Sequence, residues 1–245
     1  MKKNSIILTH PDLALTSTRT LTLTRSRTRN LTLTFTRTFI LALTLAFALP
    51  LSAQKDPGAV RVLTEFSRKA TTAPSVKIDF TVDASDTREG DITTVSGTAV
   101  IAGDSYRVTM DESIIISDGK AVWNYLTDVN EVTITDPDPE EGSFIAKPSL
   151  LFSLYEEGYK VRLLEENAEE WVIDLYPEDI NVSLVRIRLK IGKTLYDLRS
   201  AEYRTKDGMT ATLTAEKYDL TFRPAAGYFT FNPADHKGVE VIDMR

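Results

Sequence analysis

Histidine and cysteine, the residues most often used for nucleophilic and metal chemistry, are scarce in this chain. Among 245 residues there is no cysteine, and histidine occurs twice, as His10 and His236. This composition excludes a thiol nucleophile, a disulfide and a thiolate metal site. A histidine-dependent triad or a multi-histidine metal site would need further histidines. We interpret His236 as a solvated residue of a C-terminal loop.

Acidic side chains are the remaining candidates for chemistry. Carboxylates cluster at Asp136–Glu141 and Glu165–Glu170, but neither cluster has the glycine-punctuated spacing of a calcium loop. We therefore interpret both as solvated loops. A hydrolase with two catalytic carboxylates stays formally open, although no particular pair stands out. The sequence favours a protein that is not an enzyme, with no catalytic residues, no metal site and no cofactor.

The first 53 residues are expected to be a leader and not part of the fold. Residues Phe39 to Ala53 form an apolar run that ends in small residues, which is typical of a secretory signal peptide cleaved after Ala53. The run is too short for a membrane-spanning helix. Before it lies a repetitive Leu-Thr and Arg-Thr tract that ends at Thr38. This tract is either a long basic start of the signal peptide or translated sequence upstream of the true start.

The predicted mature chain, residues 54–245, is strongly acidic. Residues 1–53 hold seven Lys and Arg and one acidic residue, so 22 basic and 34 acidic residues remain, a net charge of −12. Nucleic-acid binders and proteins of anionic membranes need a basic surface, so both classes are disfavoured. Since no cysteine follows the signal peptide to carry a lipid anchor, we expect a free periplasmic protein that acts as a monomer. Its 192 residues suit one domain with a substantial core.

Hydrophobic periodicity predicts an early helix followed by many strands. Val60, Leu63, Phe66 and Ala70 share one face of a helix over Asp56–Ala70. Period-two runs then predict strands at Ser75–Ala84, Ile92–Ala102, Ser105–Asp111, Ser113–Ser117, Ala121–Thr127, Asn130–Thr135, Tyr159–Leu164, Glu170–Tyr176, Val182–Ile191, Leu195–Thr205, Met209–Phe222 and Tyr228–Phe231. Between the two groups of strands, Lys147–Gly158 reads as a short helix that is apolar over most of its girth. Such a helix has to lie on an apolar surface.

These elements make an α+β domain with a strongly curved antiparallel sheet. One face of the sheet carries a surplus of large apolar side chains. Two helices can cover that face completely, which gives an ordinary core, or incompletely, which leaves a cavity for an apolar ligand. The pattern by itself leaves both possibilities open.

A hairpin in the middle of the chain carries the first family resemblance. Ile114–Ile116 and Val122–Tyr125 flank a turn that contains Asp118-Gly119, a pair suited to the positive φ of tight hairpins. The whole stretch Asp111–Tyr125 closely resembles the hairpin of the LolA family of periplasmic lipoprotein carriers.

Further segments resemble the same family in the same order along the chain. Near the C-terminus, Gly227–Pro233 followed by Gly238–Val241 is similar to the family's closing motif. The segments Lys77–Thr81 and Ser96–Val100 resemble two of its earlier strands.

The resemblance implies an incomplete barrel of about ten or eleven antiparallel strands, covered by the N-terminal helix and a short apolar lid. It implies a carrier that takes acylated lipoproteins from an inner-membrane ABC transporter of the LolCDE type and passes them to an outer-membrane acceptor, LolB-like or unknown. The residues that we expect to line the acyl-chain cavity are Phe80, Val82, Tyr106, Val108, Met110, Ile114, Ile116, Trp123, Tyr125, Trp171 and Ile173. The expected lid residues are Leu150, Leu151, Leu154 and Tyr155. A general carrier of apolar ligands and an envelope-stress sensor on the same half-barrel are the alternatives.

One segment departs from the family pattern. Typical members have an R-P-x-x-F segment before the hairpin, in which the arginine helps to hold the lid closed. The corresponding stretch here is Ala102–Arg107. Tyr106 can replace the aromatic residue, but Arg107 is expected on the opposite face of the strand.

Overall fold

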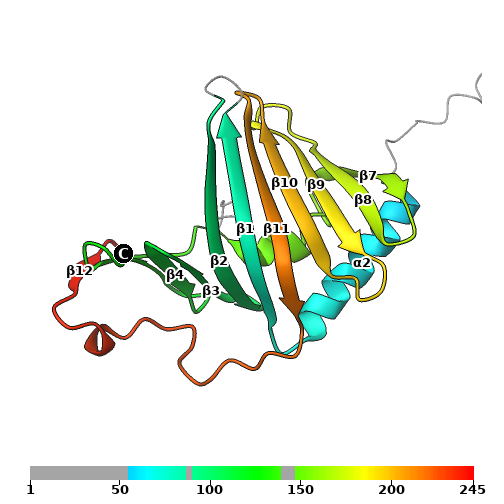
Figure 1. The fold of residues 1–245 in the computed structure, drawn as a ribbon. Coiled ribbons are helices and arrows are strands. Elements are labelled where there is room, and N and C mark those ends of the chain that lie inside the picture. Colours follow the sequence, from blue (N-terminus) through cyan, green and yellow to red (C-terminus); the bar gives the residue numbers. More distant parts are fainter. Residues whose placement is uncertain (1–54, 87–89, 139–146) are drawn as a thin grey trace, which may run out of the picture. The chain divides into compact units, whose positions relative to one another are not determined.

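The computed structural model describes residues 55–86, 90–138 and 147–245, which form one sheet with a helix against it (Figure 1). The predicted signal peptide, the tract before it and part of the acidic loop after Asp138 lie outside the described residues. Within the described part of the chain, no helix is long and apolar enough to cross a membrane.

The helices are α2 (Pro57–Thr72) and the short 3₁₀ helices η1 (Pro148–Phe152) and η2 (Pro233–Asp235). The strands are β1 (Val76–Asp86), β2 (Ile92–Ala102), β3 (Ser105–Met110), β4 (Ser113–Ser117), β5 (Val122–Leu126), β6 (Glu131–Thr135), β7 (Tyr159–Glu166), β8 (Glu170–Pro177), β9 (Leu184–Gly192), β10 (Leu198–Thr205), β11 (Met209–Asp219) and β12 (Glu240–Asp243).

The described strands form a single sheet in the order β12-β6-β5-β4-β3-β2-β1-β11-β10-β9-β8-β7. The pairing of β12 with β6 is parallel and the other pairings are antiparallel. Because β7 and β12 stand at opposite ends of this order, the sheet does not close. The predicted α+β fold with an incomplete, curved antiparallel barrel is thus confirmed, with twelve strands among the described residues.

Two predicted elements differ from the structure. Tyr228–Phe231 is not a strand, because its backbone folds into turns in which Thr230 N donates to Gly227 O at 3.1 Å. The last strand is instead β12. The predicted short helix over Lys147–Gly158 is limited to the single 3₁₀ turn of η1, followed by further turns up to Gly158, whose φ is +77°.

Helix α2 is fixed at its start by Asp56. Its carboxylate accepts hydrogen bonds from Gly58 N at 2.8 Å and Ala59 N at 3.3 Å, which are backbone donors that a helix leaves free. The same carboxylate also accepts a bond from Leu163 N in β7, at 3.2 Å. One side chain therefore caps the helix and ties it to the sheet. The buried face of α2 consists of Ala59, Val62, Leu63, Phe66, Ser67 and Ala70.

Bulges and a close approach of strands bend the sheet around this helix. The pairing of β1 with β11 shifts register between Asp79 and Phe80, and such bulges bend a strand and increase its twist. On the other side of β1, Gly97 leaves room for the Phe80 ring. A Cβ at Gly97 would lie 2.9 Å from that ring and 2.5 Å from Thr109 O. The inner face of the sheet becomes concave, and α2 crosses its β7–β10 half (Figure 1).

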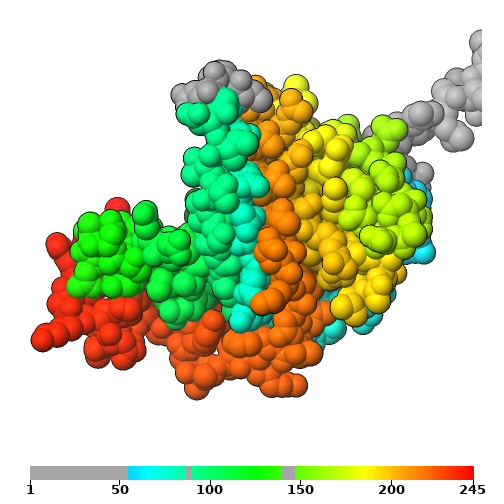
Figure 2. All heavy atoms as spheres, viewed as in Figure 1, coloured from blue at the N-terminus to red at the C-terminus, as the bar shows by residue number. Residues whose placement is uncertain are grey.

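The segment that connects β11 to β12 along the chain, residues 220–239, lies on the outer face of the sheet. We call it the C-terminal strap. Figure 2 shows this segment in orange to red, packed beneath the green strands. Arg107 holds it by donating to Tyr228 O at 3.4 Å and stacking over the Tyr228 ring at 5.5 Å. Arg107 therefore points outward, opposite to the buried Tyr106, as predicted.

The strap closes a second, smaller core. Phe231 packs with Ile116, Tyr125 and Val132 of β4–β6. His236, interpreted from sequence as a solvated loop residue, is half-buried and stacked on the Phe231 ring at 4.6 Å, with the Tyr125 ring at 4.5 Å. The imidazole is therefore a packing element of this core.

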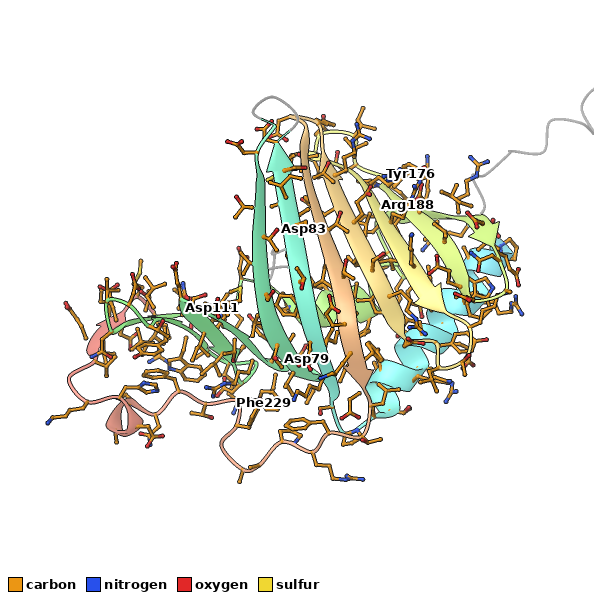
Figure 3. All side chains as sticks on the ribbon, viewed as in Figure 1. Asp79, Asp83, Asp111, Tyr176, Arg188 and Phe229 are labelled. Atoms are coloured by element: carbon orange, nitrogen blue, oxygen red, sulfur yellow. The ribbon has the colours of Figure 1, made fainter. Side chains whose placement is uncertain are left out.

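Elsewhere the outer face is polar. Asp79 and Asp83 accept bonds from Thr98 and Thr94 on β2 (Figure 3). On β8, the buried Asp174 accepts two bonds from Arg188, at 2.7 and 2.9 Å, and one from the Tyr176 hydroxyl at 2.8 Å. Burial alone would raise the pKa of Asp174, but these bonds and the charges of Arg188 and Arg186 outweigh it and lower the pKa.

Replacing Asp174 with Asn should destabilise the fold by about 2–3 kcal/mol at neutral pH, because Arg188 loses a buried charged partner. A carboxylate with a lowered folded-state pKa stabilises the fold above its unfolded pKa of about 4, and this contribution is lost as the pH falls through the folded pKa. Urea unfolding should therefore show a difference between variant and wild type that shrinks below about pH 4. Glu65→Gln, at an exposed pair with Arg68, is the control that should leave stability unchanged. A pH-independent difference would contradict this role of Asp174.

Replacing Phe231 with Ala should release the strap and β12 without unfolding the sheet, because the second core loses its central ring. Hydrogen exchange should become faster at amides of β12 and β6, while amides of α2 keep their protection. Phe229→Ala is the control, since that ring is half-buried and packs on Tyr228. Equal effects of the two substitutions would show that Phe231 does not anchor the strap.

Candidate apolar ligand cavity

The concave inner face holds a cavity of about 120 Å³ that is partly open to solvent. Its thirteen lining residues are all apolar: Ile78, Phe80, Val82, Ala99, Ile101, Val108, Met110, Ile115, Pro148, Leu151, Ala201, Ala211 and Leu213. An apolar cavity of this kind does not hold ordered water, because water would find no hydrogen-bond partners there. The site therefore suits a hydrocarbon group.

Strand alternation explains why these side chains converge. Val82 lies directly opposite Leu213 on β11 and Val95 on β2, and directly opposed residues of antiparallel strands share a face. The same alternation places Ala211 and Leu213 of β11 on the inner side and Thr212 and Thr214 on the outer side. The walls come from β1, β2, β3, β4, β10 and β11.

Helix η1 covers the cavity. Leu151 and Pro148 line it, and the next residue, Phe152, packs on the Phe66 ring of α2 at 5.3 Å. Leu154 is buried, whereas Leu150 and Tyr155 are half-buried against the main core. The Lys55 ammonium donates to the carbonyl oxygens of Tyr155 and Glu156, at 2.7 and 2.6 Å. Of the four expected lid residues, Leu151 lines the cavity and Leu150, Leu154 and Tyr155 do not.

The volume decides what the closed structure can hold. A water molecule occupies about 30 Å³ of liquid, and ligand pockets usually measure about 300–1,000 Å³. The 120 Å³ found here is therefore too small for a long acyl chain. A long acyl chain would need more room than this, and the short helix η1 borders the cavity.

The predicted cavity residues divide into four groups. Phe80, Val82, Val108 and Met110 line the cavity. Tyr106 is on the same face but outside the lining. Trp171 and Ile173 are buried in the half of the main core that α2 covers, and they do not touch the cavity.

Ile114, Ile116, Trp123 and Tyr125 belong to the second core, on the opposite face of the sheet. The prediction that they share the inner face with Val108 is wrong. In the strand register Val108 lies opposite Ile115, whereas Ile114 lies opposite Thr109. The two-residue connection Asp111-Glu112 fixes this register. Counting back from that connection would have identified Ile115 as the inward residue.

Seven further lining residues were not predicted: Ile78, Ala99, Ile101, Pro148, Ala201, Ala211 and Leu213. Ile78 and Ile101 share the inward parity of Phe80 and Ala99, so alternation could have found them. The lining alanines could not be identified in this way, because large apolar side chains were taken as the mark of a cavity wall. A cavity forms where side chains are small. Among the described residues there is no cluster of three or more His, Cys, Asp or Glu that could hold a metal ion.

Comparison with known proteins points to one family. The family model described as "Outer membrane lipoprotein carrier protein LolA" matches residues 71–232. An outer-membrane lipoprotein carrier protein from Photobacterium profundum is 26% identical over 148 residues, which cover 56% of this chain and 65% of that protein. The match thus spans just under two thirds of that protein's length.

Two solved structures align with this chain at low sequence identity, and the first of them shares its fold. An uncharacterized conserved protein from Thermus thermophilus aligns with a TM-score of 0.52 and 13% identity, over 76% of this chain and 99% of its own. A LolA superfamily protein from Nitrosomonas europaea aligns with a TM-score of 0.40 and 14% identity, over 71% and 97% of the two chains.

Replacing Ala211 with Leu should fill the cavity and separate ligand binding from stability. Binding of a fluorescent apolar dye should weaken at least about tenfold, which corresponds to about 1.4 kcal/mol. The free energy of unfolding should stay unchanged or rise by up to about 2 kcal/mol. Thr212→Leu, one residue along β11 on the outer face, should leave dye binding unaltered. Unchanged dye binding by Ala211→Leu would mean that the dye binds elsewhere.

Proposed function

This chain belongs to the LolA family of outer membrane lipoprotein carrier proteins, and from that premise we propose that it carries acylated lipoproteins through the periplasm with their acyl chains held under η1. The observation that supports this most directly is the wholly apolar lining of the cavity beneath a short cover. An ordinary core would be filled, and a polar ligand would require polar groups in the wall.

Transport of this kind needs no covalent step. Removing each methylene from water contributes about 0.8 kcal/mol, so acyl chains bind strongly once the cover has opened. Release requires the cover to open again beside a more apolar acceptor. We therefore propose a non-enzymatic carrier that needs no cofactor and no metal ion.

The cover is suited to repeated opening. Helix η1 is one 3₁₀ turn, and short 3₁₀ segments have poor hydrogen-bond geometry. Its hold on the rest of the fold comes from Leu151, Phe152 and Leu154, together with the two bonds from Lys55. Opening would expose the apolar cavity lining, while the Asp56-capped helix α2 remains in place.

The proposed partners follow from the cargo. An inner-membrane ABC transporter of the LolCDE type supplies the lipoprotein, and an outer-membrane acceptor, LolB-like or different, receives it. We propose that the predicted signal peptide exports the chain to the periplasm, where it works as a monomer.

A release assay tests this function. Inner-membrane vesicles that contain a triacylated lipoprotein and its transporter are incubated with ATP and the purified mature protein. Lipoprotein should appear in the supernatant as a one-to-one complex with the carrier, and addition of outer-membrane vesicles should remove it. Lipoprotein that stays in the inner-membrane vesicles contradicts the carrier function. Phospholipid in the supernatant in its place indicates a general lipid carrier.

Replacing Leu151 with Glu should prevent cargo binding while the sheet persists, because a charge at this buried position drives η1 away from the cavity. A triacylated lipopeptide should bind at least about tenfold more weakly, with an unchanged circular dichroism spectrum. Leu154→Glu should act in the same direction. Ser153→Glu, at an exposed position between these leucines, is the matched control. Normal binding by Leu151→Glu would exclude the cover from cargo retention.

A further inference from the structure

The burial of the inner face falls in one direction along its strands. On β2, the cavity residue Ile101 is 3% exposed, whereas Val95 is 38% exposed. On β11, the cavity residue Ala211 is buried, whereas Met209, two residues before it, is 43% exposed. Large apolar side chains are therefore open to solvent next to a buried apolar wall.

The strand register shows that the exposed residues lie toward the same end of the sheet. Ile101 lies directly opposite Val76, the first residue of β1. Met209 lies directly opposite Asp86, the last residue of β1. Val95 stands six residues before Ile101 on β2, in the direction of the same end. The inner face is thus buried where β1 begins and open to solvent where β1 ends.

Both exposed side chains belong to the face that forms the cavity wall. Val95 lies directly opposite the cavity residue Val82, and directly opposed residues of antiparallel strands share a face. Met209 and the cavity residue Ala211 are alternate residues of β11, and alternate residues of a strand point to the same side. The apolar surface of the cavity therefore continues onto Val95 and Met209.

The opposite end of the cavity is covered by η1. This helix contacts β2 and β3, and its residues Pro148 and Leu151 line the cavity together with Ile78 and Ile101. Both isoleucines are buried in the main core. The cavity therefore has a buried end at η1 and an open end where β1 finishes.

A lipid-like ligand has two ends with opposite requirements. Its hydrocarbon tail is stabilised by removal from water, whereas its polar head loses hydrogen bonds on burial unless the wall supplies partners. The thirteen residues of the cavity wall provide no polar side chain. The tail therefore suits the buried end, and the head has to remain at the open end, where water reaches it.

We propose that an acyl chain binds with its methyl end under η1, against Ile78 and Ile101, and with its polar head at the open end, beyond Val95 and Met209. This inference rests on the proposed carrier function for the class of ligand, and it deepens that function by giving the ligand an orientation. Val95 and Met209 contact the part of the chain that the cavity of about 120 Å³ does not hold. The protein part of a lipoprotein leaves the carrier past the end of β1.

Methionine methyl groups are built-in reporters of this orientation. Residues 54–245 contain three methionines: Met110 in the cavity wall, Met209 at the open end and Met244 after β12. Met110 lies opposite Gly97, which lies opposite Phe80 of β1. Since Met209 lies opposite the end of β1, six residues further on, the levels of Met110 and Met209 are about 20 Å apart along that strand.

NMR of the purified mature protein with ¹³C-labelled methionine methyl groups tests the orientation. The probes are two stearic acids, one with a nitroxide beside its carboxylate and one with a nitroxide near its methyl end. An unpaired electron broadens the signals of nearby nuclei. The first probe should broaden Met209 more than Met110, the second should broaden Met110 more than Met209, and Met244 should keep its intensity with both. The reverse order, equal broadening, or no broadening at either residue would each overturn the proposed orientation.

A substitution tests the contact at the open end. Met209→Gln keeps the length of the side chain and removes its apolar character, so stearic acid should bind about three- to tenfold more weakly. Met244→Gln, the same change at an exposed position after β12, is the matched control and should leave the affinity unaltered. An unchanged affinity of Met209→Gln, or an equal loss in both variants, would contradict a contact between Met209 and the ligand.

The release assay with inner-membrane vesicles separates this inference from the carrier function. If the methionines broaden in the expected order but no lipoprotein is released, the orientation stands and the lipoprotein cargo is wrong. If lipoprotein is released but the order is reversed, the carrier function stands and the orientation is wrong. If lipoprotein is not released and neither Met110 nor Met209 responds to the probes, both proposals fail.

Discussion

The apolar concave face of a twelve-stranded sheet has to be shielded from water, and a single sixteen-residue helix cannot shield all of it. Helix α2 covers the half built from β7 to β10, where Ile173, Leu175 and Ile187 are completely buried. The half built from β1, β2, β3 and β11 is left to η1, which offers five residues. A sheet so curved and a cover so short leave space between them, and that space is the cavity. Incomplete shielding is therefore the physical origin of the site.

The two covers are held with different strength. Helix α2 is fixed at its first turn by Asp56, which also bonds to β7, and near its last turn by Lys69, which donates to Leu195 O at 3.0 Å. The segment after η1 is held by Lys55 through carbonyl oxygens and by a few apolar contacts. In the proposed carrier function, one half of the core would stay assembled while the other half opens. A carrier needs this division, because it has to expose an apolar site repeatedly without unfolding.

The outer face adds stability that does not depend on cargo. The strap buries Phe231 against Tyr125 and Ile116, and Arg107 binds the strap. Asp174 and Arg188 connect β8 with β9 on the same side. These contacts lie across the sheet from the cavity, so the proposed loading and release would leave them intact. Arg107 in this chain therefore acts on the strap, where it cannot hold the lid.

Alternation, turn residues and capping residues in the sequence determined the strands, the helix α2 and the central hairpin. Val82 and Phe80 alternate with polar residues, which assigns them to one face, and Asp118-Gly119 and Pro57 mark a turn and a helix start. Alternation cannot decide a run such as Ile114–Ile116, because apolar side chains point to both faces and both faces are buried here. Only the tertiary structure assigned Ile115 to the cavity and its neighbours to the second core, and packed His236 against two aromatic rings. The cavity itself is also a tertiary property. Its volume depends on how completely side chains fill the space on the concave side of the sheet.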